Sequence, residues 1–243
     1  MNGVANIKWV EAASYEEMSK IAADIFKEKL KQNPATVLGL ATGGTAEGFY
    51  KELVKAYKAG EISFENAQSF NLDEYVGINP ENKASYHYYM DQQLFTHVDM
   101  KRENIHLPKG NTADLQAAAT EYDAMIKAVG GIDIQLLGIG VNGHIGFNEP
   151  GTPFTLETNV IELTQSTREA NKIYFNSIDE VPTHAITMGI QTIMNAKKVV
   201  LLISGALKQE AINRLRSGEV TEDFPASVLN NHQDVTVIYT GVK

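Results

Sequence analysis

Two short stretches of the chain carry side chains suited to acid–base chemistry. His144 and Glu149 share a loop shaped by glycine and proline, where a carboxylate can orient an imidazole that titrates near neutrality. Asp73 and Glu74 end an apolar run, and because adjacent strand residues point to opposite faces, we expect only one of them to face a shared pocket. The simpler alternatives are a structural loop histidine and a solvated acidic turn. Metal binding is the weaker interpretation, because no second His or Asp lies at ligand spacing near His144.

A second group of residues could bind an anion. Thr42-Gly43-Gly44-Thr45 lies between an apolar run and a helical one, so its N–H groups, helix dipole and hydroxyls could hold a phosphate. The Gly-Lys-Ser/Thr of a Walker A loop does not follow, and an ordinary strand-to-helix turn is the alternative. Arg168, whose guanidinium can grip phosphate with two hydrogen bonds, is a further candidate. Lys208, expected in the first turn of a helix, is another, although a solvated lysine is the simpler interpretation.

A glycine pattern after another apolar run matches the letters of a dinucleotide-binding fingerprint. It reads Gly138-Ile139-Gly140-Val141-Asn142-Gly143. The fingerprint requires a helix to begin at these glycines, whereas here Gly146, Pro150 and Pro153 follow. The context therefore argues against a dinucleotide site.

These candidates lie at the ends of strands in an alternating α/β pattern. Compact apolar runs predict strands at 36–41, 67–72, 105–107, 132–139, 199–203 and 235–239. Helical spacing predicts helices at 14–26, 49–57, 85–95, 111–129, 186–194 and 206–215. Together they predict one α/β domain spanning residues 1–243, with an open, mostly parallel, Rossmann-like sheet covered by helices on both faces. In such sheets the ligand binds beyond the carboxyl ends of the strands.

The stretch from Asn142 to about Asn176 interrupts this pattern. It contains Pro150, Pro153 and several Gly, Asn and Thr residues without a clear period. A long irregular segment inside a compact domain is usually functional or mobile.

Composition narrows the class of protein. The chain has 243 residues, of which 43% are hydrophobic and 21% charged, as is ordinary for a soluble domain. A net charge of −9 argues against non-specific nucleic-acid binding but not against one small phosphorylated ligand. The sequence has no cysteine, no signal-peptide pattern and no apolar run long enough to span a membrane, so we expect a cytoplasmic protein without a membrane partner.

Four motifs resemble those of the glucosamine-6-phosphate deaminase (isomerising) family. They are Leu40-Ala41-Thr42-Gly43-Gly44-Thr45, Phe70-Asn71-Leu72-Asp73-Glu74-Tyr75-Val76-Gly77, Gly143-His144-Ile145-Gly146-Phe147-Asn148-Glu149-Pro150 and Thr167-Arg168-Glu169-Ala170-Asn171. Their order, spacing and joint presence are far more specific than any one of them, and the similarity covers nearly the whole chain. The same superfamily contains 6-phosphogluconolactonases and ribose-5-phosphate isomerases.

The resemblance implies that glucosamine 6-phosphate and water become fructose 6-phosphate and ammonium, without a metal or other cofactor. His144, hydrogen-bonded to Glu149, would assist opening of the pyranose ring. Asp73 would take the proton from C2 and return it to C1 through an enolamine, and the resulting C2 imine would be hydrolysed. Segment 150–176 resembles the active-site lid of the family. The residues that would hold the 6-phosphate are Thr42, Gly43, Gly44, Thr45, Arg168 and Lys208.

Two features depart from the family pattern. Many members have Asp where this chain has Asn142, which cannot stabilise an imidazolium by charge, so we expect His144 to depend on Glu149 alone and to be less basic. Hexameric members activated by N-acetylglucosamine 6-phosphate have basic residues after the Asn-Glu-Pro motif and a longer C-terminus. Here residues 158–162 read Thr-Asn-Val-Ile-Glu and the chain stops at Lys243. We therefore expect no such activation, and a monomer or small homo-oligomer.

Two other functions compete with this interpretation. A 6-phosphogluconolactonase tends to have Arg after the Asp-Glu pair and a Gly-His-Thr-Ala-Ser-Leu type of loop, whereas Tyr75 and the 146–149 run favour the deaminase. A sugar-phosphate sensor of a transcription repressor is expected to carry a helix-turn-helix extension and an incomplete acid–base set. This chain keeps Asp73, His144 and Glu149, which argues against the sensor.

Overall fold

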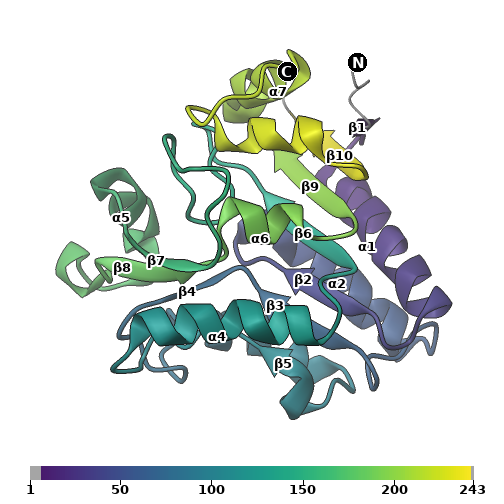
Figure 1. Ribbon diagram of the computed structural model, residues 1–243. Coiled ribbons are helices and arrows are strands. Elements are labelled where there is room, and N and C mark those ends of the chain that lie inside the picture. Colours follow the sequence, from purple (N-terminus) through teal and green to yellow (C-terminus); the bar gives the residue numbers. More distant parts are fainter. Residues whose placement is uncertain (1–6, 242–243) are drawn as a thin grey trace.

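A seven-stranded parallel sheet with the order β1-β10-β9-β6-β2-β3-β5 forms the centre of the molecule (Figure 1). The computed structural model describes residues 7–241. The strands are β1 (Ile7–Glu11), β2 (Val37–Leu40), β3 (Gln68–Asn71), β5 (Ile105–His106), β6 (Ile134–Gly138), β9 (Val199–Ser204) and β10 (Val235–Thr240). Every pairing among them is parallel, which confirms the expected sheet.

Helices cover both faces of this sheet (Figure 1). One face carries α1 (Tyr15–Gln32) and α2 (Gly44–Lys58), and the other carries α4 (Leu115–Ala128) and α6 (Ile190–Met194). The central strands are buried from both sides, so β9 is apolar from Val199 to Ile203 and almost fully inaccessible. The remaining α-helices are α3 (Tyr86–Gln93), α5 (Gln165–Asn171) and α7 (Gln209–Arg216). Short 3₁₀ turns are η1 (Phe95–His97), η2 (Arg102–Asn104), η3 (Lys172–Tyr174), η4 (Ile178–Glu180), η5 (Ala206–Lys208) and η6 (Pro225–Asn231).

A small antiparallel sheet lies beyond the carboxyl end of β3. It consists of β4 (Asp73–Tyr75), β8 (His184–Thr187) and β7 (Asn159–Glu162), with β8 in the middle. At the left of Figure 1 it extends away from the main sheet, with α5 above it. The stretch expected to be irregular therefore contains a strand, β7, and a helix, α5. Both elements are too short to show a clear period in the sequence.

The helix expected at 186–194 is wrong. Residues 184–187 form β8, and only Ile190–Met194 is helical. Gly189 separates the two elements at a point of close backbone approach, because a Cβ there would lie 2.0 Å from the carbonyl oxygen of Leu156. In the sequence, the residues of β8 and α6 form one continuous apolar run, and periodicity alone cannot assign such a run to helix or strand.

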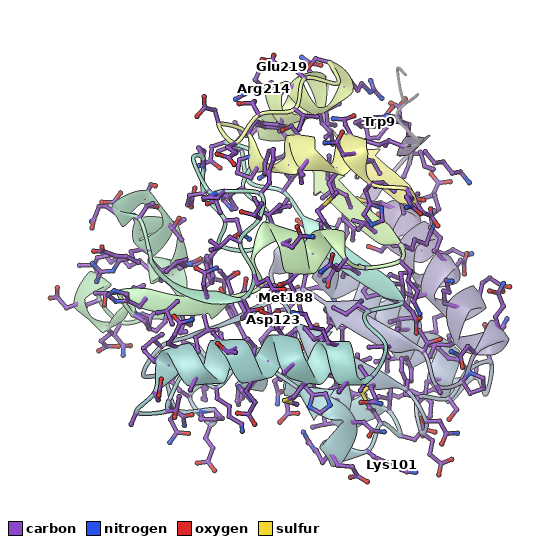
Figure 2. The ribbon with its side chains drawn as sticks, viewed as in Figure 1. Trp9, Lys101, Asp123, Met188, Arg214 and Glu219 are labelled. Atoms are coloured by element: carbon purple, nitrogen blue, oxygen red, sulfur yellow. The ribbon has the colours of Figure 1, made fainter. Side chains whose placement is uncertain are left out.

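Asp123 ties α4 to the second sheet and to α6. Its carboxylate accepts hydrogen bonds from Thr158 N (2.8 Å), Thr158 Oγ1 (2.7 Å) and Thr192 Oγ1 (2.9 Å). Figure 2 labels Asp123 and Met188 in the region between α4 and α6, and both residues are buried. A buried carboxylate with three donors is satisfied, so this contact is structural. Among the described residues, no helix is long and apolar enough to cross a membrane.

Candidate active site

Asp73 lies at the junction between the two sheets. Strand β3 ends at Asn71, and β4 begins at Asp73, which is the antiparallel partner of Thr187 in β8. The carbonyl of the intervening Leu72 accepts a hydrogen bond from Met188 N (2.7 Å). This ladder directs the Asp73 side chain, which is 7% exposed, into a cavity of about 190 Å³ that His144 also lines.

The surroundings of Asp73 favour its protonated form. Burial and, to a smaller extent, the charge of neighbouring Glu74 raise the pKa of Asp73 to about 8, although a hydrogen bond with Thr187 opposes the shift. A carboxyl group with this pKa is well matched to proton transfer near neutral pH. Asp73 therefore differs from a surface acid, since it is buried and lines a cavity.

Glu74 points away from this cavity, as the alternation of a strand predicts. Its carboxylate accepts hydrogen bonds from the backbone N–H groups of Tyr75 (2.8 Å), Tyr86 (3.1 Å) and His87 (3.0 Å). The side chain of His87 also contacts it, with Nδ1 at 2.9 Å. Two of these donors belong to the first turn of α3, so Glu74 caps that helix and fixes it against β4. The expectation that only one of the two carboxylates faces the pocket is confirmed.

Glycines allow the loop after β6 to hold the His144 ring against its own backbone. A Cβ on Gly140 would lie 2.1 Å from His144 Cε1, so only glycine leaves room for the imidazole. Gly143 has a φ of 86° and packs on the ring of Phe224, and its carbonyl accepts a hydrogen bond from Ala226 N (2.9 Å). The loop is thus held between β6 and η6.

Asn142 stands between His144 and Glu149. Its Oδ1 lies 2.7 Å from His144 Nδ1, and its Nδ2 donates to Glu149 Oε2 (2.8 Å). The direct distance from His144 Nδ1 to Glu149 Oε2 is 3.6 Å, longer than a hydrogen bond. The structure therefore differs from the expected direct His144–Glu149 bond, because the asparagine amide connects the two residues in series.

The same amide determines which imidazole nitrogen is free. The backbone N–H of His144 also donates to Asn142 Oδ1 (3.2 Å), which fixes the amide with its oxygen toward the histidine. That oxygen can only accept, so His144 Nδ1 carries the proton and Nε2 is left as the basic atom. Burial lowers the pKa of His144, Glu149 raises it and Lys208 lowers it, with a net decrease. The result is a neutral imidazole.

The turn 42–45 begins α2 beside the cleft. Gly43 has a φ of 111°, which only glycine adopts without strain, and the first N–H groups of α2 have no partner within the helix. Thr42 borders both the cavity of Asp73 and an adjoining cavity of about 270 Å³. A cradle of free N–H groups at a helix N-terminus can bind a phosphate.

The two expected cations, Lys208 and Arg168, bond to backbone carbonyls outside the 42–45 turn. Lys208 is half-buried, and its Nζ donates to the carbonyl of Ile139 (2.6 Å), near enough to His144 to affect its pKa. Burial also lowers the pKa of Lys208. The guanidinium of Arg168 donates to the carbonyls of Ile178 and Val181, both at 3.0 Å, and so joins α5 to η4 and to the residue that follows it. In this conformation Arg168 contacts backbone oxygens and not the cradle.

Sequence reasoning missed several residues that line the cleft. Tyr86 and Tyr89 both border the larger cavity, and Tyr86 stacks on Phe147 with ring centroids 6.2 Å apart. Thr167, from α5, donates to Glu149 Oε1 (2.8 Å). The i, i+3 spacing of the two tyrosines places them on one helix face and is a signal that could have separated them from Tyr88.

The arrangement combines an acid–base pair with an anion cradle. A buried carboxyl group and a neutral imidazole line one cavity and can move protons on a ligand held between them. Residues 7–241 contain no group of three or more His, Asp or Glu side chains arranged to hold a metal ion.

Comparison with known proteins gives consistent matches over almost the whole chain. Residues 10–238 match the sequence model of the family described as glucosamine-6-phosphate isomerases/6-phosphogluconolactonase. A glucosamine-6-phosphate deaminase from Lysinibacillus sphaericus is 58% identical over 97% of this chain and 99% of its own length. Glucosamine-6-phosphate deaminase 1 of Bacillus subtilis is 50% identical, covering 96% of each chain. The solved structure of a monomeric glucosamine-6-phosphate deaminase superposes with a TM-score of 0.94 at 49% identity, covering 97% of this chain and 98% of its own.

Proposed function

The chain belongs to the glucosamine-6-phosphate isomerase/6-phosphogluconolactonase family, and we propose that it is a glucosamine-6-phosphate deaminase. The enzyme converts D-glucosamine 6-phosphate and water into D-fructose 6-phosphate and ammonium. One observation carries the assignment of roles: Asp73 and His144 line the same cavity, beside the helix N-terminus that can bind the phosphate.

Ring opening is the first step assigned to this site. The free Nε2 of His144 is the basic atom, and it can take the proton of the O1 hydroxyl and deliver a proton to the ring oxygen O5 as the C1–O5 bond breaks. Asn142 holds the imidazole in the required tautomer through Nδ1, and Glu149 holds the Asn142 amide. In this proposal His144 moves the protons, Asn142 orients the imidazole, and Glu149 orients the Asn142 amide.

Isomerisation is the step assigned to Asp73. Its carboxylate removes the proton from C2 of the open-chain sugar while a proton passes from the C2 ammonium group to O1, which gives an enolamine. The carboxyl group then returns its proton to C1, which gives a protonated imine at C2. The substrate carries an ammonium group on C2, next to the proton that is removed. A cation at that position favours ionisation of a carboxyl group whose pKa burial has raised, so substrate binding itself generates the base.

Hydrolysis completes the reaction. Water adds to the C2 imine to form a carbinolamine, and cleavage of the C2–N bond releases ammonia and leaves the ketone of fructose 6-phosphate. Throughout, the turn of Thr42, Gly43, Gly44 and Thr45 would hold the 6-phosphate, which fixes C1 and C2 above Asp73. Contributions of Lys208 and Arg168 to phosphate binding stay predictions; each cation keeps N–H donors beyond those that its carbonyl partners accept.

Segment 150–176 is proposed as the lid of this site, within a single domain of residues 1–243. Thr167 and Tyr174 of this segment border the larger cavity, and the Thr167 hydroxyl bonds to Glu149. The segment therefore contacts the acid–base set directly, and its movement would open and close the cleft.

The assembly state and the compartment are proposals by analogy with the relatives. A monomer without activation by N-acetylglucosamine 6-phosphate fits the similarity to a monomeric deaminase. The cytoplasm is the proposed compartment, because charged sugar phosphates are retained there.

The direct test is to incubate the purified protein with glucosamine 6-phosphate and measure ammonium and fructose 6-phosphate together. Formation of both products in equal amounts is expected. Hydrolysis of 6-phosphogluconolactone without ammonium release would identify the lactonase activity instead. Binding of the sugar phosphate without turnover would overturn the enzyme assignment.

A further inference from the structure

We infer that Tyr15 and Tyr89 are positioning residues that orient the anion cradle, through hydroxyl hydrogen bonds to the backbone carbonyls of the 43–45 turn. The inference rests on the proposed function, in which this turn holds the 6-phosphate. Neither tyrosine belongs to the motifs of the site, and they come from two different helices, α1 and α3.

Tyr89 contacts the turn from α3. Its hydroxyl donates to the carbonyl oxygen of Gly43 at 2.8 Å. This carbonyl also accepts the N–H of Ala46 (3.1 Å), so both of its lone pairs are used. Burial raises the pKa of Tyr89 far above its usual range, which keeps the hydroxyl protonated and able to donate at every pH of interest.

Tyr15 contacts the turn from the first residue of α1. Its hydroxyl lies 2.9 Å from the carbonyl oxygen of Gly44 and 3.2 Å from that of Thr45, and it accepts the N–H of Gly48 (2.9 Å). In a regular helix the N–H of Gly48 would donate to the carbonyl of Gly44. Here the tyrosine hydroxyl also bonds to both of these groups, since it accepts from Gly48 N and donates to the carbonyl of Gly44.

Gly48 is the residue that leaves room for this contact. A Cβ at position 48 would lie 2.9 Å from Tyr15 Cε1 and 2.3 Å from Ser19 Oγ. Any larger residue would push the Tyr15 ring away from the first turn of α2. The close approach of α1 and α2 at this point, which includes the Tyr15 contact, therefore depends on Gly48.

These bonds determine the direction of the cradle N–H groups. The C=O and N–H of one trans peptide point in opposite directions. A carbonyl of Gly43 held by Tyr89 therefore turns the N–H of Gly44 away from α3, and a carbonyl of Gly44 held by Tyr15 turns the N–H of Thr45 away from α1. On the outer side the turn is open, because a Cβ built on Gly43 or Gly44 meets no atom within 4 Å. The two tyrosines thus prearrange two donors for an anion.

The test compares Tyr15→Phe and Tyr89→Phe, which remove only a hydroxyl, with Tyr239→Phe as the matched control. The hydroxyl of Tyr239 bonds to Arg216 (2.8 Å), away from the cradle. The measurements are the inhibition constant of inorganic phosphate, KM and kcat for glucosamine 6-phosphate, and Tm. We expect each of the first two variants to raise KM and the phosphate inhibition constant about three- to tenfold, since one positioning bond is lost, with kcat within about twofold. Tyr239→Phe should change neither constant.

Tyr15→Phe is the decisive variant, because Tyr15 does not border the cavities whereas Tyr89 does. An effect of Tyr89→Phe alone would mean that Tyr89 touches the ligand directly, and would overturn the inference. So would a fall in kcat at unchanged KM. If Tyr15→Phe lowers Tm too far to assay, Gly48→Ala displaces the same ring from the α2 side and should raise the same two constants.

Gly43→Ala separates this inference from the proposed function. The substitution strains a backbone with a φ of 111° and should disrupt the cradle whatever the tyrosines do. If Gly43→Ala leaves the phosphate inhibition constant and KM unchanged, the turn is not the phosphate site and the proposed roles fail. If Gly43→Ala raises both constants but the two phenylalanine variants do not, the cradle stands and the positioning inference is wrong.

Discussion

Replacing Asp73 with asparagine should abolish activity and at the same time stabilise the fold. Asp73 is buried at the junction of the two sheets, and this burial raises its pKa from 3.8 to about 8. In the unfolded chain the carboxyl group ionises freely above about pH 4, whereas in the folded protein it holds its proton. Folding at neutral pH therefore requires proton uptake by Asp73, and the protein loses stability as the pH rises from 3.8 to about 8.

The expected gain follows from this difference in pKa. At pH 7 Asp73 is ionised in the unfolded wild type but mostly protonated in the folded protein, which lowers the free energy of unfolding. The pH lies about three units above the unfolded pKa of 3.8, and at 1.36 kcal/mol per unit the loss is about 4 kcal/mol. The same calculation gives about 3 kcal/mol at pH 6 and about 5 kcal/mol at pH 8. The asparagine side chain of the variant would not titrate, so the stability gap between variant and wild type should widen with pH by about 2 kcal/mol over this range.

Urea unfolding of Asp73→Asn and wild type at pH 6, 7 and 8 measures this gap, and initial rates on glucosamine 6-phosphate measure the activity. We expect kcat to fall by at least about 100-fold, because an amide cannot accept the C2 proton. The matched control is Asp123→Asn, a second buried carboxylate that accepts three hydrogen bonds from Thr158 and Thr192. That variant should lose about 1–3 kcal/mol, because an amide NH2 would face a donor. Equal stability of Asp73→Asn and wild type at all three pH values would refute the reasoning, and so would retained activity.

Three further predictions concern the histidine relay, the lid and the assembly. Asn142→Asp would place a carboxylate 2.7 Å from His144 Nδ1, which should raise the pKa of His144 and move the acid limb of the pH–rate profile upward; an NMR titration of the imidazole that does not change would contradict this. Thr167→Ala removes the bond to Glu149 Oε1, so KM should rise about fivefold and hydrogen exchange of α5 should quicken; unchanged exchange would show that the bond does not hold the lid. Light scattering should give a mass near 26.7 kDa, with hyperbolic kinetics in the presence or absence of N-acetylglucosamine 6-phosphate; sigmoidal kinetics abolished by that compound would show that the enzyme is an allosteric oligomer.

The alternation of apolar runs and helical spacing was enough to predict the parallel sheet and to place Asp73 and His144 at strand ends. This is possible because burial on both faces favours apolar residues along a central strand, as in β9. The opposite directions of Asp73 and Glu74 also followed from the two-residue period of a strand. These are local properties, which a sequence displays directly.

The electrostatics and precise partners of the site were decided by contacts between distant segments. The pairing of β4 with β8 buries Asp73 beside Thr187, and this burial, invisible in the sequence, raises its pKa. The position of Asn142 between His144 and Glu149 is visible only in the folded loop, because a hydrogen bond depends on directions that sequence spacing does not specify. Tyr15 and Tyr89 reach the cradle from helices 29 and 46 residues away in sequence. The sequence by itself determined which residues could do chemistry, and the tertiary structure decided their protonation, their orientation and the residues that support them.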